Sequence, residues 1–218
     1  MGGPLRAVPH RHERLPCRDR VGPGRGRPRR AASPSSAAAG GGSGGDDFPW
    51  KSLSVPVYSL ATAGTDDDDE AAGAAPATMN IVTYCSAVSI RPVRKYALGL
   101  YVGTLSWENF LREGRGVLQV LNASHAGAVE LLGTRSGRDV DKLAALGDAG
   151  LELADWRGVR ILKGCAAGLL LERAADAPAD PIPCGDHDVV IADVVDIFVG
   201  DRESPLLSTG QLRDLGII

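Results

Sequence analysis

The sequence predicts a mainly β protein, an antiparallel barrel with short helices around it. Most of its apolar segments are short, rich in β-branched residues and closed by Gly or Pro, which is typical of strands. Loops or short helical stretches connect these segments, whereas a parallel repeat of strands needs helices of about 10–15 residues between them. With 44% hydrophobic residues in 218, the chain can bury one core. One domain of about 150–170 residues follows.

Three strands are predicted in the first half of this barrel. A run of β-favouring residues over Leu53–Thr62 indicates the first. The second is Met79–Ile90, which Arg91-Pro92 closes, because a residue before proline is held extended and proline cannot continue a ladder. The third is Tyr96–Gly103. Strands resume later in the chain at Gly116–Leu121, Val159–Leu162, Cys165–Arg173 and Asp188–Val199.

Three short helices are predicted between the strands. The first covers Ser106–Leu111, with Thr104 or Ser106 available as its N-cap. The others cover Ala126–Leu132 and Asp139–Leu146, and a glycine follows each of them closely. Because all three are short, we expect them at the periphery of the barrel.

The net charge of −3 averages two unlike parts of the chain. Residues 1–45 hold nine Arg, no Lys and two acids, whereas the rest holds fifteen basic and twenty-five acidic residues. An acidic body argues against nucleic acid as a partner, because phosphate contacts need clustered Lys and Arg. No apolar run approaches the ~18–20 residues that span a bilayer, so the sequence excludes an integral membrane protein.

The basic segment, residues 1–47, is predicted to be disordered because it is built mainly of Arg, Pro, Gly, Ser and Ala. It has no apolar stretch of a secretory signal, which favours an intracellular protein. Two interpretations remain open. As a transit peptide, the segment would direct the protein to a plastid or mitochondrion; as a dispensable tail or leader, it would leave the protein in the cytoplasm.

No metal site is predicted. The four cysteines (Cys17, Cys85, Cys165 and Cys184) are scattered without a CxxC pair, so we expect them to be small buried hydrophobic residues. Five consecutive acids, Asp66–Glu70, lie in a low-complexity loop at 64–77. They lack the alternating ligands and the glycine of a calcium loop, which indicates a solvated loop.

Hydroxyl groups gather in one part of the chain where the sequence carries no nucleophile elbow, phosphate-binding glycine loop or dinucleotide motif. Hydroxyls beside free N–H groups at a helix N-terminus form a phosphate site. The competing interpretation is that they only cap a helix and bond across strands. The residues are Thr83, Tyr84, Ser86, Ser89, Thr104 and Ser106.

Two adjacent stretches resemble the flavin reductase-like, FMN-binding split-barrel proteins. Asn80–Pro92 matches a strand that ends in Val-Ser-x-x-Pro, and Gly103–Phe110 matches a helix start of the form Thr/Ser-x-x-Asn. Further stretches match the family in the same order, so the resemblance covers Phe48 to Gly216. They are Gly116–Leu121, Ser136–Lys142, Gly185–Ile191 with its Gly-Asp-His motif, and Pro205–Gly216.

The resemblance implies a six-stranded antiparallel Greek-key split barrel over residues 48–218, a homodimer that holds FMN near its subunit interface. The flavin ring is then expected along Thr83, Tyr84, Cys85 and Ser86, with Ser89 near the ribityl chain or the phosphate. Thr104 and Ser106 are expected to bind the phosphate. His187 is the expected catalytic residue, on the side where hydride arrives from NADH or NADPH; its alternative role is that of a structural turn histidine.

The chain departs from the family at the phosphate site. Many relatives place Arg or Lys just before the phosphate-binding Thr/Ser, but here Thr104 and Leu105 precede Ser106. A cation is then expected from Arg94, Lys95, Lys142 or the partner subunit.

The predicted function is that of an FMN-binding oxidoreductase that transfers hydride from NAD(P)H to flavin, with flavin and nicotinamide as its small-molecule partners. The alternative is a non-catalytic role on the same barrel, as an FMN-binding or storage protein or as a dimeric interaction module.

Overall fold

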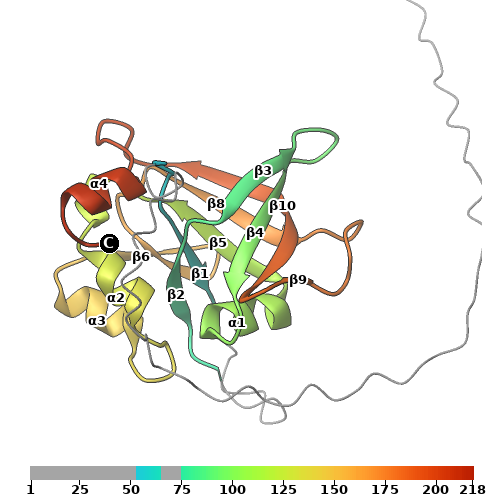
Figure 1. Ribbon diagram of the computed structural model, residues 1–218, viewed down its shortest axis with the longest axis horizontal. Helices are drawn as coiled ribbons and strands as arrows, with labels where there is room; N and C mark the ends of the chain where they lie inside the picture. Colours follow the sequence, from blue (N-terminus) through green and yellow to red (C-terminus); the bar gives the residue numbers. More distant parts are fainter. Residues whose placement is uncertain (1–52, 65–74) are drawn as a thin grey trace, which may run out of the picture. The chain divides into compact units, whose positions relative to one another are not determined.

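A single curled antiparallel sheet with short helices outside it forms the framework of the described part of the protein (Figure 1). The computed structural model describes residues 53–64 and 75–218. The predicted basic segment 1–47, Cys17 and residues 65–74 of the acidic loop lie outside the described residues. The prediction of a mainly β antiparallel barrel is confirmed, although the sheet has eight strands where six were expected.

The sheet follows the order β2-β1-β5-β8-β10-β4-β3, and the short strand β9 pairs with β10. Strand β10 joins two halves, because it pairs with β8 on one side and with β4 on the other. A separate hairpin consists of β6 (Leu153–Trp156) and β7 (Val159–Leu162). The strands of the sheet are β1 (Tyr58–Thr62), β2 (Thr78–Val82), β3 (Cys85–Ser89), β4 (Lys95–Tyr101), β5 (Arg115–Val120), β8 (Ala167–Arg173), β9 (Ile182–Cys184) and β10 (His187–Val199).

The predicted strand Met79–Ile90 is two strands, and this correction explains part of the higher strand count. The chain leaves β2 at Thr83 and Tyr84 and enters β3, which pairs with β4. The Tyr84 carbonyl accepts a hydrogen bond from the Gly99 N–H at 2.6 Å. A Cβ atom at Gly99 would lie 3.0 Å from the Tyr84 Cβ, so glycine permits this close approach.

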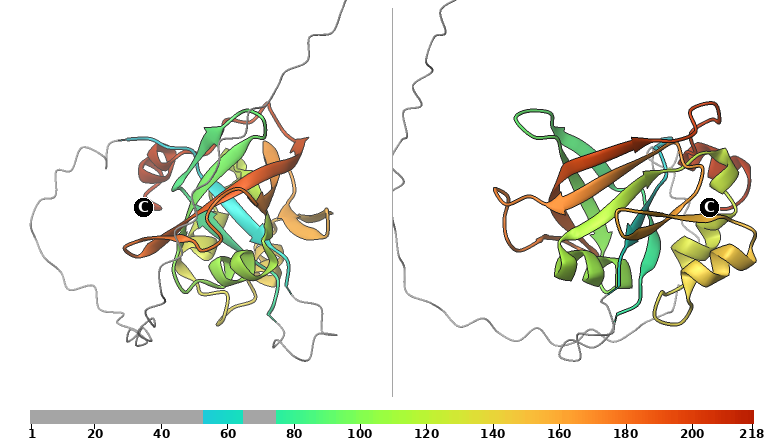
Figure 2. Two further views of the ribbon diagram at one scale, coloured as in Figure 1. Left: turned by 90° about the vertical axis from the view of Figure 1, so that its right-hand side faces the viewer. Right: turned by 180° about the vertical axis from the view of Figure 1, so that it is seen from behind.

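Within residues 53–64 and 75–218, four short helices and one 3₁₀ turn lie outside the sheet, and Figure 2 shows the helices from two further sides. The three predicted helices are present, whereas β6, β9 and α4 were not predicted. Among the described residues, no helix combines the length and apolarity needed to cross a membrane. The helices are α1 (Leu105–Glu113), α2 (Ala128–Thr134), α3 (Lys142–Asp148) and α4 (Thr209–Asp214), and the 3₁₀ turn is η2 (Ala123–His125).

Two apolar clusters hold the fold together. Inside the curled sheet, Leu60, Leu98 and Leu118 pack around Phe110 of α1, and all four are fully buried. Gly116 makes room for this ring, because a Cβ atom there would lie 3.0 Å from Phe110 Cδ2. The second cluster packs α2, α3, α4 and the β6–β7 hairpin onto the sheet. Burying a large apolar side chain stabilises the fold by about 1.5–3 kcal/mol.

Buried amides tie the helices and the hairpin to the sheet. The Asn109 Nδ2 donates to Thr62 Oγ1 at 3.2 Å and to the Pro76 carbonyl at 3.0 Å, which fixes α1 against β1 and the entry to β2. The Gln119 Oε1 accepts from the Leu162 N–H at 2.6 Å, which fixes the hairpin. Since a buried polar group without a partner is costly, these bonds specify where each element docks.

The first predicted strand is shorter than expected. Only Tyr58–Thr62 belongs to β1, while the residues before it follow the segment that leads into α4. The Val57 N–H donates to the Leu207 carbonyl and the Thr209 N–H to the Val55 carbonyl, each at 2.9 Å. The two ends of the described chain therefore close on each other.

The cysteines were predicted to be buried, and this prediction is only partly correct. Cys165 is buried and Cys85 is half-buried, but Cys184 is exposed. Cys184 lies on the short edge strand β9, whose three residues are all exposed. This strand pairs with β10 and packs no side chain into either core cluster, so its thiol remains in contact with solvent.

Candidate functional site

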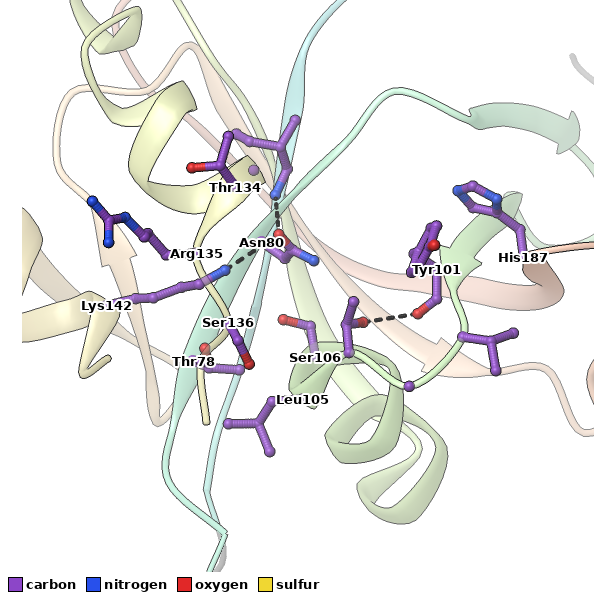
Figure 3. A pocket seen from close by; sticks show the side chains of 16 residues that line it. Thr78, Asn80, Tyr101, Leu105, Ser106, Thr134, Arg135, Ser136, Lys142 and His187 are labelled. Atoms are coloured by element: carbon purple, nitrogen blue, oxygen red, sulfur yellow. Dashed lines mark hydrogen bonds between the residues drawn. The ribbon is translucent and has the colours of Figure 1, made fainter. Parts of the chain in front are cut away.

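A cavity of about 490 Å³ opens at the N-terminal end of α1, between β2, the end of β4 and the loop from α2 to α3 (Figure 3). A second cavity of about 80 Å³ shares Asn80, Tyr101, Ser106 and His187 with it, so the two form one site. Besides these, the larger cavity is lined by Thr78, Ile81, Val102, Gly103, Thr104, Leu105, Gly133, Thr134, Arg135, Ser136, Gly137 and Lys142.

Thr104 sets the start of α1 at the edge of this cavity. Its hydroxyl accepts a hydrogen bond from the Trp107 N–H at 3.3 Å and donates to the Tyr101 carbonyl at 2.9 Å. Of the two residues predicted as possible N-caps, Thr104 and Ser106, Thr104 is the one that caps α1. Within the described part of the chain, the backbone N–H groups of Leu105 and Ser106 have no hydrogen-bond acceptor.

The hydroxyl of Ser106 is available to a ligand. The residue is only 4% exposed and lines both cavities, yet its hydroxyl makes no hydrogen bond to any described residue. Since no buried side-chain nitrogen or oxygen among the described residues lacks a partner, the Ser106 oxygen is open to the cavity. Together with the two N–H groups, Ser106 forms a set of donors that suits an anion at a helix N-terminus.

The opposite wall carries a buried cation. Lys142 is 4% exposed, and its Nζ donates to the Leu132 carbonyl at 2.7 Å and to Asn80 Oδ1 at 3.4 Å. No carboxylate of the described residues pairs with it. Burial lowers the pKa of the Lys142 ammonium to about 8. Figure 3 shows this side chain reaching toward Asn80.

Of the three cations expected from the sequence, only Lys142 lines the cavity. Lys95 lies at the opposite end of β4 from Tyr101 and pairs with Asp176 at 2.6 Å and Asp193 at 2.5 Å. Arg94 lines a separate groove of about 240 Å³. Lys142 is therefore the cation that the fold supplies near Ser106.

The charge of Glu108 in the first turn of α1 opposes an anion at this site. An ion pair offsets it, since the Arg138 guanidinium lies 2.5 Å from Glu108 Oε1. Arg135 lines the cavity itself. The positive end of the helix dipole is thus not cancelled by its own acidic residue.

Aromatic rings gather at the other end of the site. The His187 ring lies edge-on between two exposed tyrosines, with ring centroids 5.0 Å from Tyr84 and 5.2 Å from Tyr101. His187 Nδ1 bonds to Asp186 Oδ1 at 2.7 Å, which lowers the pKa of that carboxyl group. A carboxylate only accepts, so Nδ1 donates in this bond and Nε2 of the neutral ring is an acceptor.

The structure brings together five of the eight residues predicted for the site: Thr83, Tyr84, Thr104, Ser106 and His187 line the two cavities. Cys85 packs against the core inside the sheet, and burial raises the pKa of its thiol to about 12. The Ser86 hydroxyl donates to the Ala87 carbonyl at 3.4 Å, and Ser89 lines the groove with Arg94. These three lie away from the cavity because the chain changes direction at Tyr84.

Six polar lining residues were not named as site candidates: Thr78, Asn80, Tyr101, Thr134, Arg135 and Ser136. Asn80 and Ser136 each open a stretch that carries the resemblance, so their positions in those motifs were an available signal. The others come from separate elements, which only the folded chain brings together. No group of three or more His, Cys, Asp or Glu able to hold a metal ion occurs in the described part of the protein.

An apolar groove of about 750 Å³ adjoins the cavity and shares Ile81, Gly133 and Thr134 with it. It runs along α2 and α4, and its rim carries Leu53 and Ile218, which are 62% and 61% exposed. Tyr84 also contributes to the groove and is 66% exposed. Such a contiguous apolar surface is typical of an interaction site.

Solved structures share this fold at low sequence identity. The chain is similar to nitrilotriacetate monooxygenase component B from Mycobacterium thermoresistibile, with a TM-score of 0.58, 18% identity, and coverage of 73% of this chain and 78% of that chain. An FMN-binding protein from Thermus thermophilus gives a TM-score of 0.54, 18% identity and coverage of 77% and 80%. For a candidate oxidoreductase from Sinorhizobium meliloti the TM-score is 0.56 at 18% identity; the match covers 73% of this chain and 48% of the other.

The family itself is shown by the sequence. Comparison with curated proteins finds none that matches. Residues 50–216, however, match the model of the flavin reductase like domain. This range is most of the chain and includes every residue that lines the cavity. The chain therefore belongs to the flavin reductase-like domain family.

Proposed function

We propose that this protein binds FMN in the cavity at α1 and transfers hydride from NADH or NADPH to the flavin. The observation that carries the proposal is the Ser106 hydroxyl in a member of the flavin reductase-like family: it is open to the cavity, has no hydrogen-bond partner among the described residues, and lies next to two N–H groups without an acceptor. The cavity volume of about 490 Å³ falls in the range of about 300–1,000 Å³ found for small-molecule sites.

The phosphate of FMN is assigned to the helix N-terminus. Ser106 and the N–H groups of Leu105 and Ser106 supply hydrogen bonds there, and the helix dipole favours a negative charge. Thr104 acts indirectly in this assignment, because its hydroxyl already holds the first turn of α1.

The flavin ring is assigned to the aromatic end, beside Thr83, Tyr84 and Tyr101. FMN supplies the chemistry of hydride acceptance, so the chain needs neither a nucleophile nor an acid–base pair. His187 lies between the two tyrosines with Asp186 fixing its ring, which suits a residue that positions the nicotinamide.

We infer further that the protein is a homodimer. The apolar groove along α2 and α4 adjoins the cavity, and Leu53, Tyr84 and Ile218 at its rim are more than half exposed. A second copy of the chain on this face would bury them and close the flavin site. Light scattering coupled to size exclusion tests the inference: a mass of two chains supports it, and a mass of one chain contradicts it.

The full chain, purified and stripped of flavin, provides the main test. Added FMN should show the spectral shift and the fluorescence quenching of a bound flavin, and NADH or NADPH should then bleach its absorption. Failure of FMN to bind would overturn the proposal. Binding without any oxidation of either nicotinamide would instead support the non-catalytic FMN-binding or storage role.

A further inference from the structure

The two ends of the curled sheet are built differently. At one end α1 inserts Phe110 into the inner apolar cluster, whereas the β3–β4 turn lies at the other end, as Figure 1 shows. A groove of about 240 Å³ opens beside this turn, and we name it the Arg94 groove. It shares no lining residue with the cavity at α1 or with the apolar groove along α2 and α4.

A β-bulge in β10 builds the apolar wall of the Arg94 groove. The pairing with β8 shifts just after Val194, which lies opposite Leu171. Ile197 then lies opposite Leu169, and both leucines belong to the inner cluster. Without the extra residue of the bulge, the alternation of the strand would turn Ile197 to the outer face. Ile197 is 42% exposed, so this wall is apolar and open to a ligand.

Arg94 is a cation without a carboxylate partner at this groove. Within residues 53–64 and 75–218, no Asp or Glu lies within ion-pair distance of its guanidinium. The two carboxylates in this part of β10 are engaged by other cations: Asp193 pairs with Lys95 and Asp196 with Arg157, each at 2.5 Å. The groove is therefore a positive site on an acidic body, which favours an anion.

Tyr96 adds a hydrogen-bond donor beside this cation. Its ring packs against the inner cluster, and its hydroxyl makes no hydrogen bond to any described residue and is open to the groove. Burial raises the pKa of Tyr96 and the Cys85 thiol adds to the rise, while the nearby charge of Arg94 opposes it. The phenol therefore keeps its proton at neutral pH and can donate. The Arg94 carbonyl accepts from the Val194 N–H at 2.8 Å, which holds the Arg94 backbone against β10.

We propose that the Arg94 groove binds a small amphipathic carboxylate, an anion whose body is one aromatic ring or a short alkyl chain. Arg94 pairs with the carboxylate, and Tyr96 donates a hydrogen bond to it. The apolar body packs on Leu169, Val194 and Ile197. The volume of about 240 Å³ lies below the roughly 300 Å³ at which sites for drug-sized ligands begin, so the occupant is small. This site is separate from the proposed flavin reaction and does not depend on it.

The charge of the groove argues against two occupants from the chain itself. Residues 1–45 hold nine Arg and two acids, so Arg94 repels this basic segment. A twofold contact between two copies, centred on the groove, would bring two Arg94 side chains together, and these also repel each other. A carboxylate ligand meets neither penalty.

Isothermal titration calorimetry of the full chain at neutral pH tests the site with 3-phenylpropionate and with 3-phenylpropan-1-ol, its uncharged analogue. One series contains saturating FMN and another contains none, which separates binding in the cavity at α1 from binding in the Arg94 groove. The variants are Arg94→Met and Tyr96→Phe. Arg91→Met is the matched control, because Arg91 is an exposed cation of the same turn that does not line the groove. Circular dichroism and thermal unfolding confirm that each variant is folded.

We expect one 3-phenylpropionate to bind per chain with or without FMN, and the alcohol to bind about tenfold more weakly. Arg94→Met should weaken binding of the carboxylate by about 10- to 100-fold, the effect of losing a hydrogen bond between charged groups. Tyr96→Phe should weaken it by about three- to tenfold, as for one neutral donor. Arg91→Met should stay within about twofold of the wild type.

Four results would overturn the assignment. If the wild type binds no 3-phenylpropionate up to about 10 mM, or binds the alcohol equally well, the groove is only an apolar surface. If saturating FMN abolishes binding, the carboxylate occupies the cavity at α1. Equal weakening in Arg91→Met and Arg94→Met would reduce the effect to surface charge. A smaller mass of Ile197→Glu than of the wild type in light scattering would assign the groove to a second copy of the chain.

Discussion

The indole N–H of Trp107 donates a hydrogen bond to Asp188 Oδ2 at 3.0 Å, across 81 residues of sequence. Trp107 lies in the first turn of α1, and Asp188 follows His187 at the start of β10. This bond therefore joins the proposed phosphate end of the cavity to its aromatic end. Asp188 is buried, so its carboxylate depends on this donor.

Replacing Trp107 with Phe should lower the free energy of unfolding by about 1.5–3 kcal/mol, because a buried carboxylate loses its hydrogen bond. Urea denaturation measures this value. The double variant Trp107→Phe/Asp188→Asn should lose less unfolding free energy than the sum of the losses in the two single variants, as expected for partners in one hydrogen bond. Strictly additive losses would show that the two side chains do not interact.

Thr104 and Ser106 should respond differently to truncation, although both are hydroxyl residues of one helix start. Thr104→Ala removes the cap and should cost about 1 kcal/mol of stability. Ser106→Ala removes a hydroxyl without an internal partner, so its stability should stay within about 0.5 kcal/mol of the wild type. FMN affinity, measured by fluorescence titration, should fall about tenfold for Ser106→Ala, as for one lost hydrogen bond. Equal FMN affinity in Ser106→Ala and the wild type would contradict the proposed phosphate site.

His187 and Asp186 should act on turnover more than on flavin binding. His187→Gln should lower kcat/KM for the nicotinamide by about tenfold, the loss of a contact of ~1.4 kcal/mol. Asp186→Asn weakens the hydrogen bond that orients the His187 ring and should lower kcat/KM by a smaller factor. FMN affinity should be unchanged in both variants, and steady-state oxidation of NADH and NADPH supplies the rates. A kcat/KM equal to that of the wild type in His187→Gln would indicate a structural turn histidine.

The described cysteines should differ in reactivity. Cys184 is exposed and should be alkylated first at pH 8, whereas burial raises the pKa of Cys165 to about 11 and that of Cys85 to about 12. Only a thiolate reacts, so these two should be protected in the native protein. Peptide mapping by mass spectrometry after brief treatment with iodoacetamide gives the order. Labelling of Cys85 as fast as that of Cys184 would contradict the burial.

The raised pKa of Cys85 also predicts an effect of alkaline pH on stability. Above the ordinary pKa of 9.0 the unfolded state loses the thiol proton while the folded state keeps it. Stability from this group is therefore complete below pH 9 and is lost as the pH rises toward 12. Between pH 8.5 and 10.5, Cys85→Ala should lose less unfolding free energy than the wild type, as measured by urea denaturation at each pH.

Local sequence predicted those elements whose pattern is complete within a short segment. Strand β7 has the predicted bounds Val159–Leu162, and β10 begins one residue before its predicted start. The break at Thr83 and Tyr84 was missed because Met79–Ile90 is β-favouring throughout, and only the approach of Gly99 to Tyr84 divides it. Tertiary contact decided the conformation there.

The site was predictable where it coincides with a motif, as at Thr104, Ser106 and His187. Cys85, Ser86 and Ser89 were expected beside them because the family resemblance implies that the flavin lies along this stretch. Lys142 was one of three candidate cations, and its local pattern does not indicate which of the three reaches the cavity; Arg135 was not expected there. Their place follows from the packing of α2 and α3 on β2.

The position of β10 between β8 and β4 has a consequence for the synthesis of this protein. Until residues 187–199 leave the ribosome, the β3–β4 hairpin has no link through the sheet to the strands β2, β1, β5 and β8. His187 is then also missing, and two strand edges remain open to other chains. Flavin loading should therefore follow the emergence of β10 from the ribosome, and nascent forms ending before β10 should depend on chaperones to stay soluble.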